Sequence, residues 1–217
     1  MVVQSRFAYP LPAGLAPETA AVLMCAGLAV FPPLRRYTQP GDAVGVVGLG
    51  GLGHLAVQFA KALGCEVTVL SSSAGKETEA RAFGADHFLL SADRTAMEQA
   101  EFRFDLLLAT APRGNDWGAL LMALKKRGRL VLPAFSPLHL PLAAASGSGP
   151  AVDLVVHEVS ITGSFLGSCA DMRQMLGFAA EHRVVPAVET LPLAQANEAL
   201  RRVEENRARY RVVLLHE

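Results

Sequence analysis

The chain has 217 residues, of which 51% are apolar and 6% aromatic, and a mean hydropathy of +0.30. This composition excludes a disordered or fibrous protein and supplies enough apolar side chains for one sizeable core. Twenty Lys and Arg residues balance twenty Asp and Glu residues, without any run of five like charges. The sequence therefore lacks the basic surface that nucleic acid or an anionic membrane would require, and we expect a small-molecule substrate.

The cysteines and the first apolar stretch bear on where the protein resides. Cys25, Cys65 and Cys169 are an odd, scattered set, which is typical of reduced thiols in the cytoplasm rather than of a disulfide framework. Residues 20–31 are apolar, and we expect the proline pair at 32–33 to end the stretch. It is then too short to span a membrane and poorly placed for a secretory signal, so we predict a cytoplasmic protein.

Apolar, strand-like runs alternate with helical patterns over most of the chain. Continuous apolar strands separated by helices indicate a parallel sheet covered on both faces, and the fold class we predict is a doubly wound α/β sheet. The predicted elements, in chain order, are strand 43–47, helix 52–63, strand 66–70, helix 75–83, strand 87–90, strand 104–109, helix 116–126, strand 129–132, strand 160–165 and helix 171–182.

The pattern changes twice after the fifth predicted strand. Residues 133–150 contain AAASGSGP and show no periodicity, so we expect a mobile loop there. From residue 184 the sequence predicts an extended segment, VVPAVETLPL, then a helix at 193–206 and a final strand at 210–215. We see no internal repeat.

A glycine motif follows the first predicted strand. Residues 43–54 read AVGVVGLGGLGH, with three glycines spaced as G-x-G-x-x-G. The first glycine permits a tight turn, the second lets the backbone approach a pyrophosphate, and the third lets the helix pack closely on the sheet. Because the motif leaves a strand and opens a helix, it favours a dinucleotide-binding Rossmann domain over a glycine-rich turn without a ligand. The phosphate-binding residues we predict are Gly48, Gly50, Gly51, Leu52 and Gly53.

The end of the second predicted strand bears on the choice of cofactor. An acidic residue there would bind the ribose 2′-hydroxyl of NAD, but the chain instead reads Ser71, Ser72, Ser73, Ala74, Gly75, Lys76. Hydroxyls and an ammonium group suit a 2′-phosphate, which favours NADP(H). Alternatively, the three serines cap the following helix, since serine is a preferred N-cap residue.

Several segments are similar to one known family. They are PLPAGLAPETAAVLMCAGLAVFPPLRR, VGVVGLGGLGHLAVQFAKALG, TVLSSSAGKETEARAFGADHF, EVSITGSFLGSCADMRQMLGFAAEH and the ending NEALRRVEENRARYRVVLLHE. These segments resemble the medium-chain zinc alcohol dehydrogenases, and among them the cinnamyl-alcohol-dehydrogenase-like, NADP-dependent branch. The resemblance extends over nearly the whole chain.

The resemblance implies an NADP(H)-dependent oxidoreductase that interconverts an alcohol and an aldehyde, with zinc polarising the substrate oxygen. It implies that Thr110 and the three residues Ser164, Phe165 and Leu166 line the nicotinamide side. The family's polypeptide also has a GroES-like catalytic region that precedes these segments. The domains implied here are a remnant of that region with an interdomain helix at 1–30, a Rossmann domain at 31–166, and a segment at 167–217 that would return to the catalytic domain.

Cys25 matches the family's third protein ligand of catalytic zinc. A catalytic zinc site normally needs three protein ligands, and we expect this chain alone to lack a complete one. For the chain alone, we favour the interpretation of Cys25 as a small apolar residue in a buried helix. We interpret His54, which follows the glycines as in the family, as structural.

Three positions depart from the family's pattern. Ala29 stands where the family has a threonine that helps to hold the cofactor, and the pair at 133–134 replaces an expected glycine. The loop at 137–157 is longer than usual. These departures bear on the geometry of the cofactor site.

Two alternative functions remain open. One is an NADP(H)-binding, self-associating module without turnover. The other is a zinc-independent quinone oxidoreductase of the same superfamily, which GLGGLG and the context of Cys25 disfavour. Apolar residues before Cys25 and after Gly167 would either pack on one another or leave an exposed patch that drives association, and we expect a homodimer or a larger assembly.

Overall fold

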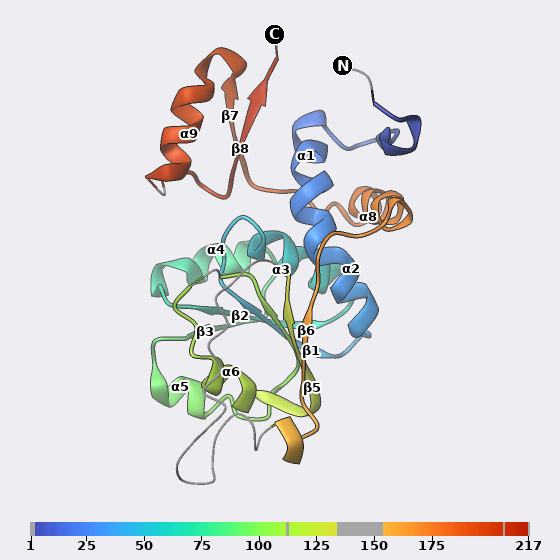
Figure 1. Ribbon diagram of the computed structural model, residues 1–217. Helices are drawn as coiled ribbons and strands as arrows, with labels where there is room; N and C mark the ends of the chain where they lie inside the picture. Colours follow the sequence, from blue (N-terminus) through green and yellow to red (C-terminus); the bar gives the residue numbers. More distant parts are fainter. Residues whose placement is uncertain (1–2, 112, 134–153, 206, 217) are drawn as a thin grey trace.

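A six-stranded parallel sheet forms the centre of the molecule (Figure 1). The computed structural model describes residues 3–111, 113–133, 154–205 and 207–216. The strand order is β3-β2-β1-β4-β5-β6, with every neighbouring pair parallel. This order places the topological switch point, where ligands bind in such sheets, between β1 and β4. The strands are β1 Ala43–Val47, β2 Glu66–Ser71, β3 His87–Leu90, β4 Phe104–Ala109, β5 Leu124–Leu132 and β6 Ser160–Gly163.

Helices cover both faces of the sheet, as the sequence predicts. On one face lie α2, α3 and α4, and on the other lie α5 and α6. Strand β4 shows the division, because Leu106 and Leu108 join the first apolar cluster while Leu107 and Ala109 join the second. These helices are α2 Leu28–Tyr37, α3 Gly53–Ala62, α4 Glu77–Ala82, α5 Arg94–Glu98 and α6 Trp117–Met122. The doubly wound α/β fold is confirmed.

The N-terminal helix extends beyond the apolar stretch at 20–31 in both directions. A short 3-10 turn, η1 Ser5–Phe7, precedes α1 Pro17–Val22, the π-helical turn η2 Leu23–Gly27 and α2, and the last three form one continuous helix. This 21-residue helix, Pro17–Tyr37, is long and apolar enough to cross a membrane by length and composition alone, but 72% of its apolar window is buried inside the structure. The proline pair at 32–33, which bounds the apolar stretch in the sequence, lies inside α2 and does not end the helix. Both prolines are buried, and this packing offsets the two helical hydrogen bonds that they cannot donate.

A smaller unit follows the sheet. Helix α8 Cys169–His182 begins with a capping box of Ser168 and Asp171 and packs on α2. After it, β7 Val188–Pro192 and β8 Arg211–Leu215 pair in parallel, joined by η4 Leu193–Gln195 and α9 Ala196–Glu204. Helix α1 contacts both β7 and β8, so the two ends of the described chain lie on the same side of the molecule (Figure 1). The boundaries at 30 and 166 remain predictions.

The largest differences between predicted and observed element boundaries lie between α6 and β5. Helix α6 ends at Met122 and β5 begins at Leu124, although the sequence predicts helix to residue 126 and strand only from residue 129. Leu124 pairs with Phe104 across a register shift, and Lys125 pairs with Asp105 at 2.7 Å, so tertiary contacts override the local helical pattern. The predicted loop at 133–150 lies outside the described residues from position 134 onward.

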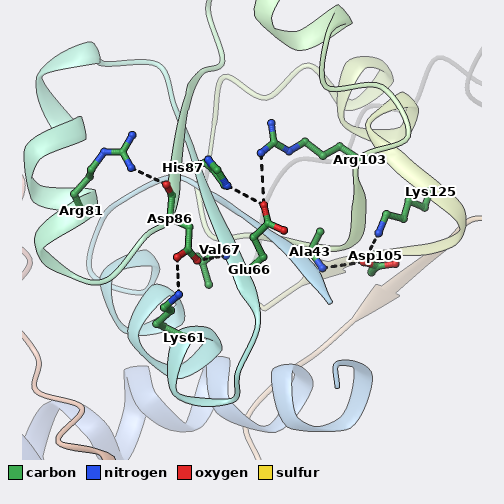
Figure 2. Close-up of polar contacts among 10 residues, drawn as sticks. All are labelled: Ala43, Lys61, Glu66, Val67, Arg81, Asp86, His87, Arg103, Asp105 and Lys125. Carbon is green, nitrogen blue, oxygen red and sulfur yellow. Dashed lines mark hydrogen bonds and ion pairs between the residues drawn. The ribbon is translucent and has the colours of Figure 1, made fainter. Parts of the chain in front are cut away.

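Polar side chains close the end of the sheet where the strands begin (Figure 2). Asp86 accepts hydrogen bonds from the Val67 N–H at 2.9 Å and from Lys61 at 2.5 Å. Asp105 accepts the Ala43 N–H at 2.8 Å, and Glu66 pairs with the ring of His87. These contacts satisfy backbone donors at the amino edge. The opposite edge, where the parallel strands end and which we call the carboxyl edge, holds the candidate site.

Candidate functional site

The glycine loop has the geometry that the motif predicts. Gly48 has φ +91° and donates its N–H to the Leu70 carbonyl at 2.8 Å. A methyl group on Gly53 would lie 2.0 Å from the Gly48 carbonyl oxygen, whereas one on Gly50 would meet nothing within 4 Å. Only glycine therefore permits the close packing at position 53 and the positive φ at position 48. Position 50 leaves its backbone open to an approaching ligand.

Thr110 fastens this loop to the end of β4. Its hydroxyl lies 3.0 Å from the Val47 carbonyl oxygen and 2.9 Å from that of Gly48, and its N–H donates to Val47. The side chain thus fixes the turn from β1 into α3. Leu52 is the N-cap residue of α3 and supplies no side-chain cap, so the first turn of this helix has no protein side chain in the capping position.

His54 lies buried beneath the loop. Its Nδ1 is 2.9 Å from the Gly50 carbonyl oxygen, and its ring packs between Phe83 and Tyr210 with centroids 5.4 and 4.8 Å away. The buried Nε2 has no hydrogen-bond partner among the described residues. Burial lowers the pKa of His54 from 6.5 to about 4, against the Gly50 hydrogen bond. The folded state therefore binds this proton less readily than the unfolded chain, and stability falls as the pH drops from 6.5 toward about 4.

The three serines do not cap the next helix. Ser71 is buried at the end of β2, and its Oγ accepts the Ser73 N–H at 3.2 Å. Ser73 holds the N-cap position of the 3-10 turn η3 Ala74–Lys76, but its hydroxyl makes no capping hydrogen bond there. Ser72 and Ser73 are exposed. The capping interpretation is wrong, because the hydroxyl of Ser71 is used to shape the turn instead.

Lys76 belongs to a cluster that the sequence alone did not reveal. The Glu79 cluster comprises Glu79, Lys76, Arg209 and Tyr210. Lys76 Nζ lies 3.0 Å from Glu79 Oε2 and 4.9 Å from the centre of the Tyr210 ring. Arg209 and the Tyr210 hydroxyl also donate to the Glu79 carboxylate. Burial opposes ionisation of Glu79, but hydrogen bonds from Tyr210 and Lys76 lower its pKa. Burial and the Glu79 hydrogen bond raise the pKa of Tyr210.

A cavity of about 590 Å³ lies against the glycine loop. We call it the glycine-loop cavity, and the C-terminal segment forms its second wall. A methyl group on Gly51 would lie 2.7 Å from the guanidinium carbon of Arg211, so this side chain covers the loop directly. The residues that line the glycine-loop cavity are Leu49, Gly50, Gly51, Lys76, Val203, Arg207, Ala208, Arg209, Tyr210, Arg211 and Val212. Arg207, Arg209 and Arg211 were not among the predicted site residues. The sequence RARYR at 207–211 places them at alternate positions, which was the available signal for a basic wall.

Other predicted site residues lie elsewhere along the carboxyl edge. Ser164, Phe165 and Leu166 directly follow β6, and Phe165 is 69% exposed. The Ser164 N–H donates to the Leu132 carbonyl at 2.9 Å. None of the three lines the glycine-loop cavity. The structure thus brings Gly50, Gly51 and Lys76 together and leaves the residues that follow β6 apart from them.

Cys25 is exposed, in the π-helical turn η2. The interpretation of Cys25 as a buried apolar residue was therefore wrong, because Cys25 lies four residues after the exposed Ala21, on the outer face of the helix. Among residues 3–111, 113–133, 154–205 and 207–216, no three His, Cys, Asp or Glu side chains come together in a group that could hold a metal ion. The described residues thus do not fit a zinc site by themselves.

The comparisons with known proteins agree with this architecture. The zinc-binding dehydrogenase profile matches residues 51–181. Cinnamyl alcohol dehydrogenase 2 of Oryza sativa subsp. japonica is 41% identical over 99% of this chain, which spans 58% of that relative.

Solved structures of three dehydrogenases and reductases resemble the chain closely. A cinnamyl alcohol dehydrogenase from Sorghum bicolor has a TM-score of 0.84 and 41% identity, over 94% of this chain and 57% of its own. One from Helicobacter pylori, complexed with NADP(H), has a TM-score of 0.81 and 25% identity, and the match covers 99% of this chain and 59% of its own. Acetophenone reductase from Geotrichum candidum, in complex with NAD, has a TM-score of 0.77 and 27% identity, and the match covers 95% of this chain and 58% of its own. Because the profile covers more than half of the chain and the fold agrees, the chain belongs to the zinc-binding dehydrogenase family.

Proposed function

We propose that the chain is the cofactor-binding part of an NADP(H)-dependent oxidoreductase that interconverts an alcohol and an aldehyde. The observation that carries this proposal is the open backbone of Gly50 inside a cavity that Arg211 also lines. A pyrophosphate needs close backbone approach and positive charge, and this cavity offers both. The 41% identity with a cinnamyl alcohol dehydrogenase supports the alcohol–aldehyde chemistry.

The proposal gives separate tasks to Gly50, Arg211 and Thr110. Gly50 lets the pyrophosphate approach the backbone, and the uncapped first turn of α3 supplies N–H groups and positive dipole. Arg211, which covers Gly51, would pair with the same phosphates. Thr110 keeps the loop in this shape. When bound, the nicotinamide supplies the hydride chemistry.

The preference for NADP(H) over NAD(H) is assigned to the end of β2. Ser71 stands where a carboxylate would select NAD. Ser72 follows it in the sequence, and Lys76 lines the glycine-loop cavity. The 2′-phosphate carries close to two negative charges, which an ammonium group and hydroxyls can bind through charge-assisted hydrogen bonds.

Lys76→Ala is expected to weaken NADPH about tenfold at low salt and to leave NADH nearly unchanged, since one charge-assisted hydrogen bond contributes about 1.5–3 kcal/mol. Ser71→Asp is expected to shift the preference toward NADH. Isothermal titration calorimetry with both cofactors measures each effect. Lys126→Ala is the matched control, because Lys126 pairs with Glu158 away from the cavity. Equal losses for the two cofactors in Lys76→Ala would contradict the assignment.

The 217-residue chain is expected to purify with much less than one zinc per subunit. Cys25 matches only one family ligand, and a catalytic site needs three. Metal analysis after dialysis against a chelator measures the content. Stoichiometric zinc that survives the dialysis would show that residues outside the described ranges, or a second copy of the chain, complete a site.

A second candidate function is an NADP(H)-binding module without turnover. It is favoured by the absence of a three-ligand metal group among the described residues. An assay for reduction of an aromatic aldehyde, monitored through the decrease in NADPH absorbance, separates the two functions. Turnover supports the oxidoreductase, and tight NADPH binding without turnover supports the module. We further propose a small alcohol or aldehyde as substrate.

A further inference from the structure

The Glu79 carboxylate holds two of the cations that line the glycine-loop cavity. Its Oε2 is 3.0 Å from Lys76 Nζ, and its Oε1 accepts from Arg209. The side chain of Glu79 is 26% exposed and that of Lys76 is 35% exposed, so their ion pair is only partly screened by solvent. Arg209 is 64% exposed, so its pair with Glu79 is screened more strongly. In the structure, therefore, the charge of Lys76 and Arg209 is already directed toward a carboxylate.

The position of Glu79 is fixed by more than these cations. The Tyr210 hydroxyl donates to the same Oε2 atom as Lys76. The Tyr210 ring packs on Phe83 at 5.2 Å and on His54 at 4.8 Å, and His54 in turn bonds the Gly50 carbonyl. The carboxylate is thus held at the cavity wall by a packed aromatic side chain and cannot easily move away when an anion enters.

We propose that Glu79 competes with the 2′-phosphate of NADP(H) for Lys76 and Arg209 and so sets the margin by which the site prefers NADP(H) over NAD(H). This inference rests on the proposed function. A phosphate that binds Lys76 must displace one ion pair and approach a fixed negative charge. A ribose 2′-hydroxyl meets neither requirement. Glu79 therefore limits affinity for the phosphorylated cofactor and leaves the other cofactor unaffected.

Glu79→Gln is expected to bind NADPH about fivefold more tightly at low salt, because two partly exposed ion pairs no longer compete with the phosphate. Affinity for NADH is expected to stay unchanged. Calorimetric titration with NADPH, NADH and 2′,5′-ADP measures the three affinities. The gain is expected for both ligands that carry the 2′-phosphate, and to shrink when Lys76→Ala is added to Glu79→Gln.

Glu77→Gln is the matched control. Glu77 lies on the same helix, pairs with Arg81 at 3.1 Å and has a side chain that is 51% exposed, and it does not line the cavity. The same loss of charge at this position is expected to leave NADPH affinity unchanged.

Tyr210→Phe is a second variant with the opposite expected sign. It removes one donor to Glu79 Oε2 and keeps the aromatic ring, so the carboxylate pairs more strongly with Lys76. NADPH is then expected to bind about twofold more weakly. This variant tests the proposal even if Glu79→Gln does not fold.

The outcomes separate this inference from the proposed function. Wild-type binding of NADPH, with no gain in Glu79→Gln or an equal gain in Glu77→Gln, overturns the inference and leaves the proposed function standing. Equal affinity in Tyr210→Phe and wild type also overturns it. A wild type that binds neither NADPH nor NADH overturns the proposed function, and the inference with it.

Discussion

Gly50→Ala is expected to weaken NADPH binding by about 10- to 100-fold while leaving the thermal unfolding temperature unchanged. In the structure a methyl group at position 50 meets nothing within 4 Å, so the free protein has no steric reason to unfold. A pyrophosphate bound close to the backbone would, however, occupy the same space. Calorimetric titration and thermal unfolding of the same preparation measure both quantities.

Two further glycines serve as controls for this experiment. Gly53→Ala places a methyl group 2.0 Å from the Gly48 carbonyl oxygen and is expected to lower stability and cofactor affinity together. Gly177 lies within α8, and a methyl group there would meet nothing within 4 Å. Gly177→Ala is expected to gain about 0.4–1 kcal/mol of stability without affecting cofactor binding. Wild-type affinity in Gly50→Ala would mean that the phosphates bind elsewhere.

Phe59→Ala is expected to lower the free energy of unfolding by about 3–5 kcal/mol. Phe59 on α3 is fully buried, and its ring lies 5.2 Å from that of Phe31 on α2 and 6.3 Å from that of Phe178 on α8. The substitution therefore opens a cavity where three helices meet on one face of the sheet. Urea denaturation followed by circular dichroism measures the loss.

Phe7→Ala is the control for this prediction, because Phe7 is 52% exposed and surface substitutions change stability by about 0.5 kcal/mol or less. A loss below about 1 kcal/mol in Phe59→Ala would contradict the packing described for the three helices.

The sheet was predictable because its strands carry a strong local signal. The bounds of β1, β3 and β4 agree with the sequence prediction to the residue. In β1 and β4 both faces are covered and most side chains are buried, so the apolar run ends where burial ends. Strand β3 lies at the sheet edge and is only partly buried. Helix α5 was missed because its five residues are too few to show a period. The capping hydrogen bond from the Ala96 N–H to Asp93 shows the signal that could have located it.

The candidate site was only partly predictable. The roles of Gly48 and Gly53 follow from backbone geometry that a local motif encodes. The contact between Glu79 and Tyr210 joins residues 131 positions apart, and no local pattern specifies such a distance. The burial of Cys25 was predicted wrongly because the stretch around it is apolar on all sides, so composition alone did not show that Cys25 shares the outer helix face with the exposed Ala21.

The contact between α1 and the last strands places a constraint on folding during synthesis. The residues of β1 to β4 lie between positions 43 and 109 and can pair early. Helix α1 ends at Val22, but its partner β8 ends at Leu215, and α1 contacts β8 in the folded molecule. At about 5–20 residues per second, the ribosome needs about 10 to 40 s to extend the chain from one to the other. During that interval the face of α1 that contacts β8 lacks this partner, so the contact can form only after the last strand is synthesised.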